Sequence, residues 1–377
     1  MKKIKQLIIN SLLVIASVIS LFAILEGTAR IVEIWKPPMQ VDIGQGFGAE
    51  SLLFLPIRGG FMETNPDKSF AFHSQRFEMP KPLRTMRIFA LGGSSVNYLD
   101  YEFTCLAEDL QRAWSEQVDT VEIINCGGLS YGTHRLVLIM AEIIHYNPDL
   151  VIIYSGHNEF EELQQLHLAN LDFASAQRVL GRTALYRFMR DMRTRSEIVT
   201  LQQARQRREL ATAIPDTSTT WAHVFTAEEM EARMDAYRNN LAAIIRKCQD
   251  KEVPVIIGTV PSNLYKPNLP GSEGKQYEEV VRLFDGEHYK EGVVLGQHIL
   301  RNATPRHQSS EVENNIICHL SEEFHIPLAR VESAIIQAEP NNVPGETLFG
   351  DHCHLNAAGN TILRMVYQKV ILDIFCF

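Results

Sequence analysis

The stretch Leu150-Val-Ile-Ile-Tyr-Ser-Gly-His-Asn-Glu159 passes from five apolar residues directly into small and polar ones. Two earlier stretches have the same form: Met86-Arg-Ile-Phe-Ala-Leu-Gly-Gly-Ser-Ser95 and Val121-Glu-Ile-Ile-Asn-Cys-Gly-Gly128. Short apolar runs that are rich in β-branched residues and bounded by glycine are typical of buried strands. We therefore predict three strands, each followed by a loop of glycine and polar side chains.

Amphipathic helical patterns separate the strand candidates. One of them opens with Thr226-Ala-Glu-Glu229, a capping box that satisfies the first N–H groups of a helix. Strands that alternate with helices indicate an α/β fold, in which helices cover both faces of a parallel sheet. The expected helices span 105–117, 134–146, 226–249 and 358–374, and two further expected strands span 253–260 and 326–331.

The N-terminal region carries a long apolar run. Three lysines within the first five residues precede Leu7–Leu25, whose only polar members are asparagine and serine. As a helix, these nineteen residues would span roughly 28 Å, about the thickness of a hydrocarbon core. This length favours a single-pass transmembrane anchor over a cleaved signal peptide or a buried core helix. Because the lysines remain in the cytoplasm, we expect the rest of the chain to face the periplasm or the cell exterior.

We expect three regions along the chain: the anchor at 1–30, an extended lead-in at 31–80 that wraps the core, and an α/β domain at 81–377. A helical insert at about 160–225 interrupts this domain, because no strand pattern occurs there. From 177 to 210 the insert holds nine arginines against three acidic residues. We favour a helical cover with a solvated basic face. The alternative is a basic amphipathic lid that touches anionic lipid or substrate.

Charge and cysteine content exclude several classes of function. The 36 lysines and arginines against 45 acidic residues give a formal charge of −9, which argues against a nucleic-acid partner. The six cysteines are widely spaced and form no Cys-x-x-Cys pair, so neither a zinc ribbon nor a thioredoxin-type site is expected. The loop Gly92–Ser95 lacks the motifs of a nucleotide-binding loop. We therefore expect no cofactor, and the sequence leaves the oligomeric state open.

Residues suited to acyl transfer follow the strands and precede the last helix. In an open parallel sheet, ligands bind beyond the carboxyl ends of the strands, where Ser94, Gly127 and Asn158 are expected to lie. A serine hydroxyl becomes a good nucleophile when an imidazole removes its proton, and a carboxylate fixes the tautomer of that imidazole. His354 and Asp351 supply these two groups. Main-chain N–H groups and an amide side chain are suited to stabilise the developing oxyanion.

The four short blocks that contain Ser94, Gly127, Asn158 and His354 resemble, in this order, the sequence blocks of the SGNH (GDSL) hydrolase family. The resemblance covers about 80–160 and 225–377. Gly92-Gly93-Ser94 is similar to the Gly-Asp-Ser block of the family, and Asp351-His-Cys-His354 is similar to its Asp-x-x-His block. The resemblance implies the SGNH hydrolase fold, a flavodoxin-like three-layer parallel sheet. The long anchor and lead-in resemble those of membrane-attached bacterial members.

The resemblance also implies a role for each site residue. Ser94 would be the nucleophile, and His354 the base that Asp351 orients. The backbone N–H groups of Ser94 and Gly127 and the amide of Asn158 would form the oxyanion hole. No metal ion has a place in this scheme.

Gly93 and Glu159 stand where the family has aspartate. Because neither aspartate normally breaks the bond, these departures affect the assignment of substrate rather than catalysis. We expect a serine ester hydrolase that acts outside the cytoplasm, through an acyl-serine intermediate, on a small-molecule, glycan or lipid acyl ester. The alternatives are an O-acyltransferase or acetylesterase of a cell-surface glycan, and a non-catalytic module that binds envelope components.

Simpler interpretations of single residues stay open at this point. Ser94 could be only a helix cap, with Ser95 as the neighbouring candidate nucleophile. Gly127–Gly128 leaves the register of the backbone donor open by one residue, and Asn158 could be an ordinary turn residue. The residues 351–354 could bind a metal ion, but four adjacent side chains rarely converge on one centre. His157 fits a structural or pocket-lining role better than that of a base.

Overall fold

The computed structural model describes residues 2–36, 52–69, 71–160, 180, 182–189, 191–192, 226–269, 271–303 and 306–375. The chain forms two compact units, here called the anchor unit (1–51 with 168–215) and the sheet unit (52–167 with 216–377). Most of the expected insert at 160–225, and the part of the expected lead-in at 37–51, lie outside the described residues.

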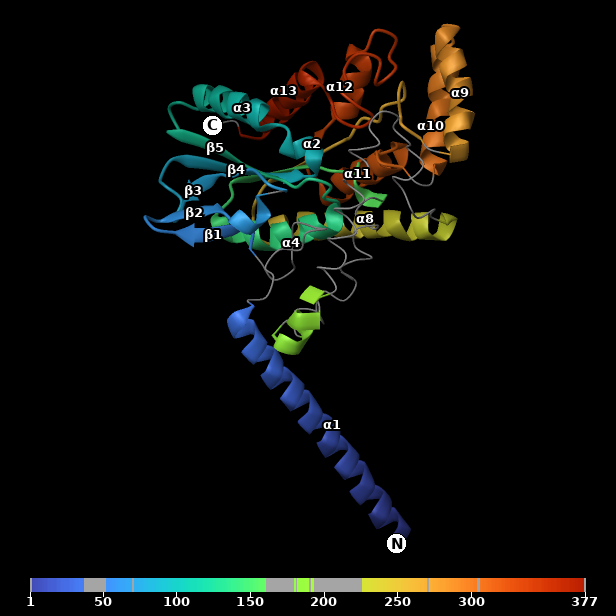
Figure 1. The fold of residues 1–377 in the computed structure, drawn as a ribbon. Coiled ribbons are helices and arrows are strands. Elements are labelled where there is room, and N and C mark those ends of the chain that lie inside the picture. The colour runs from blue at the N-terminus through green and yellow to red at the C-terminus, as the bar shows by residue number, and fades with distance from the viewer. Residues whose placement is uncertain are drawn as a thin grey trace. The chain divides into compact units, whose positions relative to one another are not determined.

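A five-stranded parallel sheet forms the centre of the sheet unit (Figure 1). Its strands are β4 (Thr85–Gly92), β5 (Thr120–Gly127), β6 (Leu150–Tyr154), β7 (Val255–Gly258) and β8 (Leu328–Ala329). The spatial order β5-β4-β6-β7-β8 corresponds to 2-1-3-4-5 along the chain, which is the flavodoxin-like arrangement. The predicted α/β class and sheet type are therefore confirmed. The first three strands end together, since Gly92 pairs with both Gly127 and Tyr154.

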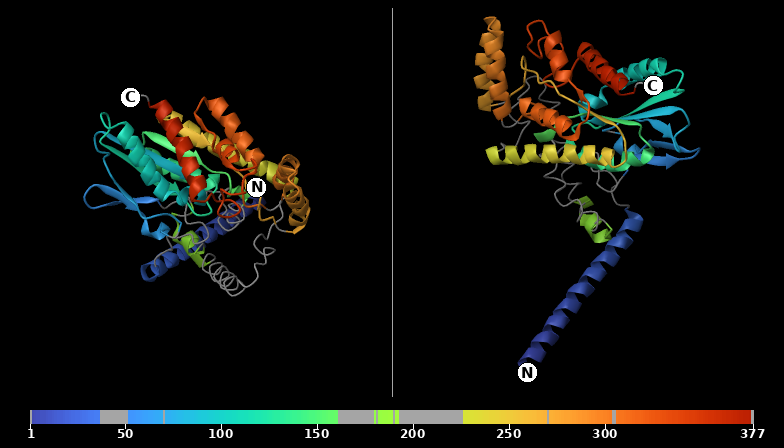
Figure 2. Two further views of the ribbon diagram at one scale, coloured as in Figure 1. Left: turned by 90° about the horizontal axis from the view of Figure 1, so that it is seen from above. Right: turned by 180° about the vertical axis from the view of Figure 1, so that it is seen from behind.

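Helices cover both faces of this sheet, and Figures 1 and 2 show the layers. On one face, α3 (Asp100–Ala113) packs against α13 (Ala357–Ile374); on the other, α4 (Thr133–Ile143) packs against α8 (Ala227–Gln249). All four overlap helices that the sequence predicts. The predicted capping box is present, with Thr226 Oγ1 accepting from the Glu229 N–H group at 3.2 Å.

The apolar patterns did not reveal several further helices of the sheet unit. The pair α9 and α10 packs around a buried cluster that includes Tyr277, Phe284 and Ile299. α11 contacts α8, and α12 contacts α13. These further helices are α9 (Gly271–Asp285), α10 (Tyr289–Asn302), α11 (Glu311–Phe324) and α12 (Val331–Ala338). The short helix α2 (Ser94–Asn97) follows β4, and 3-10 turns lie at Pro66–Lys68 and Ile144–Tyr146.

Residues 52–80 form a small antiparallel sheet rather than a purely extended segment. Its strands are β1 (Phe54–Ile57), β2 (Phe61–Thr64) and β3 (Arg76–Glu78). The backbone N–H groups of Leu53 and Phe54 donate to the carboxylate of Glu142 on α4, at 2.6 and 2.8 Å. A buried carboxylate that accepts two backbone hydrogen bonds fixes the start of this small sheet on the main body of the unit.

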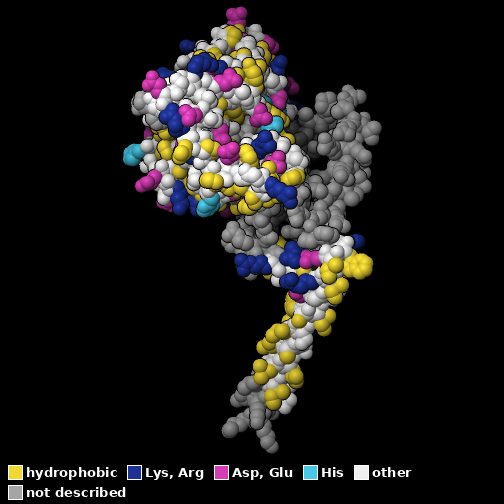
Figure 3. All heavy atoms as spheres, turned by 90° about the vertical axis from the view of Figure 1, so that its left-hand side faces the viewer, with side chains coloured by type: hydrophobic (Ala, Val, Ile, Leu, Met, Phe, Trp, Pro, Cys, Tyr) yellow, Lys and Arg dark blue, Asp and Glu magenta, His cyan; other side chains and the backbone are white. Residues whose placement is uncertain are grey.

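The described part of the anchor unit comprises the long helix α1 (Lys2–Trp35) and helical residues at 184–189 and 191–192. Residues Ile9–Trp35 are long and apolar enough to cross a membrane, a test that a signal sequence also passes. Figure 3 shows hydrophobic side chains along this helix. After the most apolar part of α1, Glu26 accepts hydrogen bonds from the Ala184 and Leu185 N–H groups. Further along the same helix, Glu33 forms an ion pair with Arg187 at 2.7 Å.

Candidate active site

Ser94, His354 and Asp351 form a continuous line of hydrogen bonds. The Nε2 atom of His354 lies 2.7 Å from Ser94 Oγ, although 260 positions separate the two residues in the chain. The Nδ1 atom of the same ring lies 2.7 Å from Asp351 Oδ2. The geometry is that of a hydroxyl, a base and a carboxylate that orients the base.

The Asp351 carboxylate is held at both of its oxygens. Its Oδ1 atom accepts from the backbone N–H groups of Cys353, at 2.9 Å, and His354, at 2.7 Å, while Oδ2 faces the imidazole. Burial by itself would raise the pKa of Asp351, but these hydrogen bonds and the nearby imidazole charge together lower it. An ionised carboxylate here keeps the proton of His354 on Nδ1, so that Nε2 can accept the proton of Ser94.

The turn between β4 and α2 presents Ser94 at the carboxyl end of the sheet. Ser94 is the first residue of α2, and N–H groups in a first helical turn have no acceptor within the helix. A Cβ atom at Gly93 would lie 2.2 Å from Asn158 Nδ2 and 2.8 Å from the Tyr131 carbonyl oxygen. Glycine at this position, in place of the aspartate of the family pattern, therefore lets the Asn158 amide lie directly against the turn that carries Ser94.

The contact with the imidazole distinguishes Ser94 from its neighbour. Ser95 Oγ is buried and has no hydrogen-bond partner among the described residues. A hydroxyl without a base next to it is a poor nucleophile. Of the two candidate serines, the geometry therefore favours Ser94.

Asn158 is buried, and its amide group is oriented by two partners. Its Nδ2 atom donates to the Tyr131 carbonyl oxygen at 3.1 Å, and its Oδ1 atom accepts from His307 Nε2 at 2.8 Å. An amide NH₂ group carries two N–H donors, and Tyr131 takes one of them. The second donor is the one that an oxyanion hole requires.

Gly127 lies close to the nucleophile turn, but its N–H group already has an acceptor. A Cβ atom at Gly127 would lie 2.2 Å from the backbone nitrogen of Asn97, so β5 approaches α2 as closely as backbones can. The Gly127 N–H group donates to Asn125 Oδ1 at 2.9 Å, and the Gly128 N–H group donates to the Gly92 carbonyl at 3.0 Å. Either glycine would have to exchange this bond to serve an oxyanion, so the expected role of Gly127 stays a prediction.

Asn125 is a site residue to which the sequence reasoning gave no role of its own. Its Nδ2 atom donates to the Val96 carbonyl at 3.1 Å and to Asp100 Oδ1 at 2.5 Å. Its side chain therefore ties the end of β5 to the helical segments that follow Ser94. Its place at the end of an apolar strand, two residues before Gly127, was the available signal.

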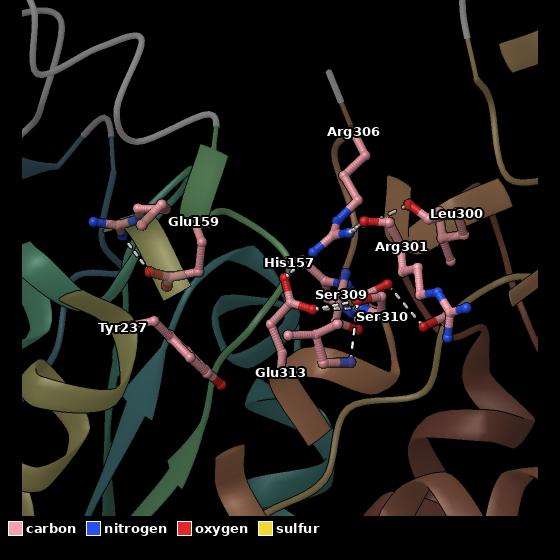
Figure 4. Close-up of polar contacts among 12 residues, drawn as sticks. His157, Glu159, Tyr237, Leu300, Arg301, Arg306, Ser309, Ser310 and Glu313 are labelled. Atoms are coloured by element: carbon pink, nitrogen blue, oxygen red, sulfur yellow. Dashed lines mark hydrogen bonds and ion pairs between the residues drawn. The ribbon is translucent and has the colours of Figure 1, made fainter. Parts of the chain in front are cut away.

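The loop 306–310 is a second element that the sequence reasoning missed. Its Ser310 opens the capping box Ser310-Glu-Val-Glu313 of α11, which indicates a helix start but not a site. Its members nevertheless contact the candidate site or the groups beside it, as Figure 4 shows in part. His307 bonds to Asn158, the Ser309 N–H group donates to His157 Nδ1 at 3.1 Å, and Arg306 pairs with Glu313 at 2.5 Å. Only the three-dimensional structure brings this loop to the ends of the strands.

His157 is buried beside the site but lacks the properties of a general base. Burial lowers the pKa of its imidazole well below the usual value, and the neighbouring His354 and His307 add to this effect. Because Nδ1 accepts from the Ser309 N–H group, the proton of the neutral ring resides on Nε2. His157 therefore presents a donor, in line with a structural or pocket-lining role.

Glu159 holds the segment Gly156–Glu159, which contains Asn158, in place by a buried ion pair. Its carboxylate, labelled in Figure 4, pairs with Arg233 on α8. It also accepts from the Thr133 N–H group at 2.9 Å and from Thr133 Oγ1 at 2.8 Å. Both Glu159 and Arg233 have fully buried side chains. The longer glutamate in place of the aspartate of the family pattern thus bridges α4 and α8.

Two groups of side chains near the site have the residue types of metal ligands. In the first, Asp351 and His354 already bond to each other and Cys353 lies beside them. In the second, His307, His352 and Cys353 have ligand atoms within 4.8 Å of one another. His352 Nε2 lies 3.1 Å from His307 Nδ1, which is also hydrogen-bond distance.

Among the described residues, a small hollow lies beside His354. A hollow of about 10 Å³ adjoins the imidazole, enough for about one water molecule. The Tyr98 ring lies 5.1 Å from the His354 ring, centroid to centroid, and the Tyr98 residue is 57% exposed. The hollow is lined by Ser95, Tyr98, Tyr154, His354, Leu355 and Asn360.

No protein-family model matches the chain, and no curated protein sequence matches it significantly. Among solved structures, it is similar to the acetyl xylan esterase AlAXEase, with 16% identity, a TM-score of 0.41, and coverage of 76% of this chain and 100% of the other. A GDSL-like lipase from Bacteroides thetaiotaomicron has 12% identity, a TM-score of 0.39 and coverage of 77% and 89%. An acetylxylan esterase from Geobacillus stearothermophilus has 12% identity, a TM-score of 0.40 and coverage of 76% and 94%. The activity of this chain must therefore be inferred from its own site.

Proposed function

We propose that this protein is a serine ester hydrolase of the SGNH type. The observation that carries the proposal is the hydrogen-bonded line from Ser94 Oγ through the His354 imidazole to the Asp351 carboxylate, at 2.7 Å for each contact. Folding does not require that residues so far apart in the sequence form this line of contacts, whereas nucleophilic catalysis requires a hydroxyl, a base and a carboxylate in this order.

In the proposed reaction, Ser94 Oγ attacks the acyl carbon of the ester while His354 Nε2 accepts the hydroxyl proton. The carbonyl oxygen becomes an oxyanion, which the free N–H of Asn158 and the Ser94 N–H group stabilise. The tetrahedral intermediate collapses, the bond to the alcohol oxygen breaks, and His354 returns the proton to the alcohol. Water then attacks the acyl carbon with His354 again as base. The bond between the acyl carbon and Ser94 Oγ breaks, His354 returns the proton to Oγ, and the acid leaves. This sequence uses no cofactor.

The exposed Tyr98 ring next to the base offers a surface for the alcohol part of the ester. The same surface could hold an acceptor alcohol in place of water, which supports O-acyl transfer to a glycan as the second candidate function. For location we propose a single-pass membrane protein whose sheet unit lies in the periplasm or outside the cell.

Covalent labelling tests the proposal directly. A fluorophosphonate probe should label the purified full chain in detergent, and Ser94→Ala should abolish the label while Ser95→Ala keeps it. Release of free acid from a short-chain ester distinguishes the hydrolase from an obligate transferase. A well-folded wild-type chain that takes no label and cleaves no ester would instead favour a non-catalytic module.

A further inference from the structure

A chain of hydrogen bonds leads from His352 through His307 to Asn158. His352 Nε2 lies 3.1 Å from His307 Nδ1, and His307 Nε2 lies 2.8 Å from Asn158 Oδ1. Asn158 Nδ2 lies 3.1 Å from the Tyr131 carbonyl oxygen. His352 lies between Asp351 and His354, so the chain begins within the catalytic loop and ends at the expected oxyanion donor.

The direction of the bond between His307 and Asn158 follows from the partner of the Asn158 amide. A backbone carbonyl can only accept, so the atom of Asn158 that faces Tyr131 is the amide nitrogen. The amide oxygen then faces His307, which must donate from Nε2. With the proton of the neutral ring on Nε2, Nδ1 of His307 is an acceptor, and His352 Nε2 donates to it.

We propose that His307 is a positioning residue for catalysis, and that His352 orients it. This inference rests on the proposed function. The Asn158 amide has two orientations related by a half-turn about its last side-chain bond, and they differ in whether N–H or C=O faces a bound oxyanion. The N–H donated by His307 favours the productive orientation, because the opposite one would place two N–H donors face to face in a buried site.

The chemistry of the pair also explains why loop 306–310 lies against the strand ends. Ser309 of the same loop fixes the tautomer of His157, and Gln308 Oε1 accepts from the Asn263 N–H group at 2.8 Å. Asn263 Nδ2 in turn donates to the Asp351 carbonyl at 2.8 Å. The loop therefore holds both halves of the site, the oxyanion donor through His307 and the catalytic loop through Asn263.

A matched pair of substitutions at His307 tests the proposal. In His307→Gln the side-chain amide nitrogen reaches about where Nε2 lies, so it still donates to Asn158. In His307→Asn the amide is one carbon shorter and does not reach. With the full chain in detergent and 4-nitrophenyl acetate as substrate, we expect kcat of H307Q within about threefold of wild type. For H307N we expect a fall in kcat of about 10- to 100-fold with KM within about threefold, because the lost interaction acts on the transition state.

A double-mutant cycle distinguishes positioning from a general structural role. Asn158→Ala should lower kcat by about 10²- to 10³-fold, the scale of a lost oxyanion donor. If His307 acts through Asn158, the double variant N158A/H307N should be no worse than N158A by more than about threefold. Losses that multiply, or an H307N enzyme equal to wild type, would overturn the proposal. His298→Asn, at an exposed histidine on α10, is the control for histidine loss and should leave kcat unchanged.

Two further outcomes are decisive. If H307N does not fold, H352L takes its place, since it removes the donor to His307 Nδ1 and should still lower kcat without changing KM. If chelator removes the activity of the wild type and Zn²⁺ restores it, then His307, His352 and Cys353 are metal ligands and the proposal is wrong. Activity that is absent from the wild type, or unchanged in S94A, refutes the proposed function and the positioning role with it, whereas wild-type activity that S94A abolishes and H307N keeps refutes the positioning role alone.

Discussion

Replacing Asp351 by asparagine should invert the proton arrangement of the site while keeping its shape. Asp351 Oδ1 accepts from two backbone N–H groups, those of Cys353 and His354. In Asp351→Asn only the amide oxygen can occupy that place, so the amide NH₂ must face His354 Nδ1. That nitrogen then has to accept, the proton moves to Nε2, and Nε2 can no longer take the proton of Ser94.

The expected loss follows from this inversion. An exchange of aspartate for asparagine at such a position lowers kcat by about 10⁴-fold, equivalent to about 5.5 kcal/mol in the activation free energy. Hydrolysis of 4-nitrophenyl acetate by the full chain measures kcat, and thermal unfolding checks that the fold is kept. Asp351→Ala is the control, since it removes the carboxylate without imposing the wrong tautomer, and it should lose less. If D351N retains more than a tenth of the wild-type kcat, His354 is not the base that Asp351 orients.

Three further perturbations are expected to act on separate parts of the unit. Gly93→Ala places a Cβ 2.2 Å from Asn158 Nδ2, so kcat for the same ester should fall by about 10- to 100-fold, and unchanged kcat would contradict the placement of this amide. Arg233→Leu leaves the buried Glu159 carboxylate without this cation, so the free energy of unfolding, measured with urea, should fall by about 3 kcal/mol. The control Arg282→Leu, at an exposed arginine, should leave it nearly unchanged. The pKa of Asp351 is lower in the folded chain than in the unfolded one, so the stability that its ionised carboxylate adds is present above about pH 4 and is lost as pH falls further. The difference in unfolding free energy between wild type and D351N should therefore shrink below that pH. A difference that stays constant would contradict the pairing of Asp351 with His354.

The parts of the fold that could be predicted are those specified by short segments. The runs that became β4 and β6 are buried almost throughout, and the run that became β5 is buried over its second half, so each carries an apolar segment that can be recognised in the sequence without its partner strands. The helices α4 and α8 present one apolar face to the sheet and show helical spacing for that reason. By contrast, β1–β3 are short strands of a small sheet, and their patterns were too weak to identify. The helices α9 and α10 do have amphipathic patterns, which the sequence reasoning missed.

The same division holds within the candidate site. Ser94 and Asn158 were identifiable because each follows a recognisable strand, and Asp351 and His354 because they share one short block. The loop 306–310 has neither signal. His307 lies 149 positions from Asn158, and nothing near it in the sequence indicates that contact.

The amino-acid sequence alone thus determined the class of the fold, the order of its main strands and the residue types available for acyl transfer, because burial and capping act over a few neighbouring residues. Only the tertiary structure decided which of these groups meet, that Ser94 rather than Ser95 contacts the imidazole, and that the Gly127 N–H group is already paired with Asn125. Hydrogen bonds select partners by distance in space, and the distance between residues from different strand ends is set by the packing of the whole sheet unit.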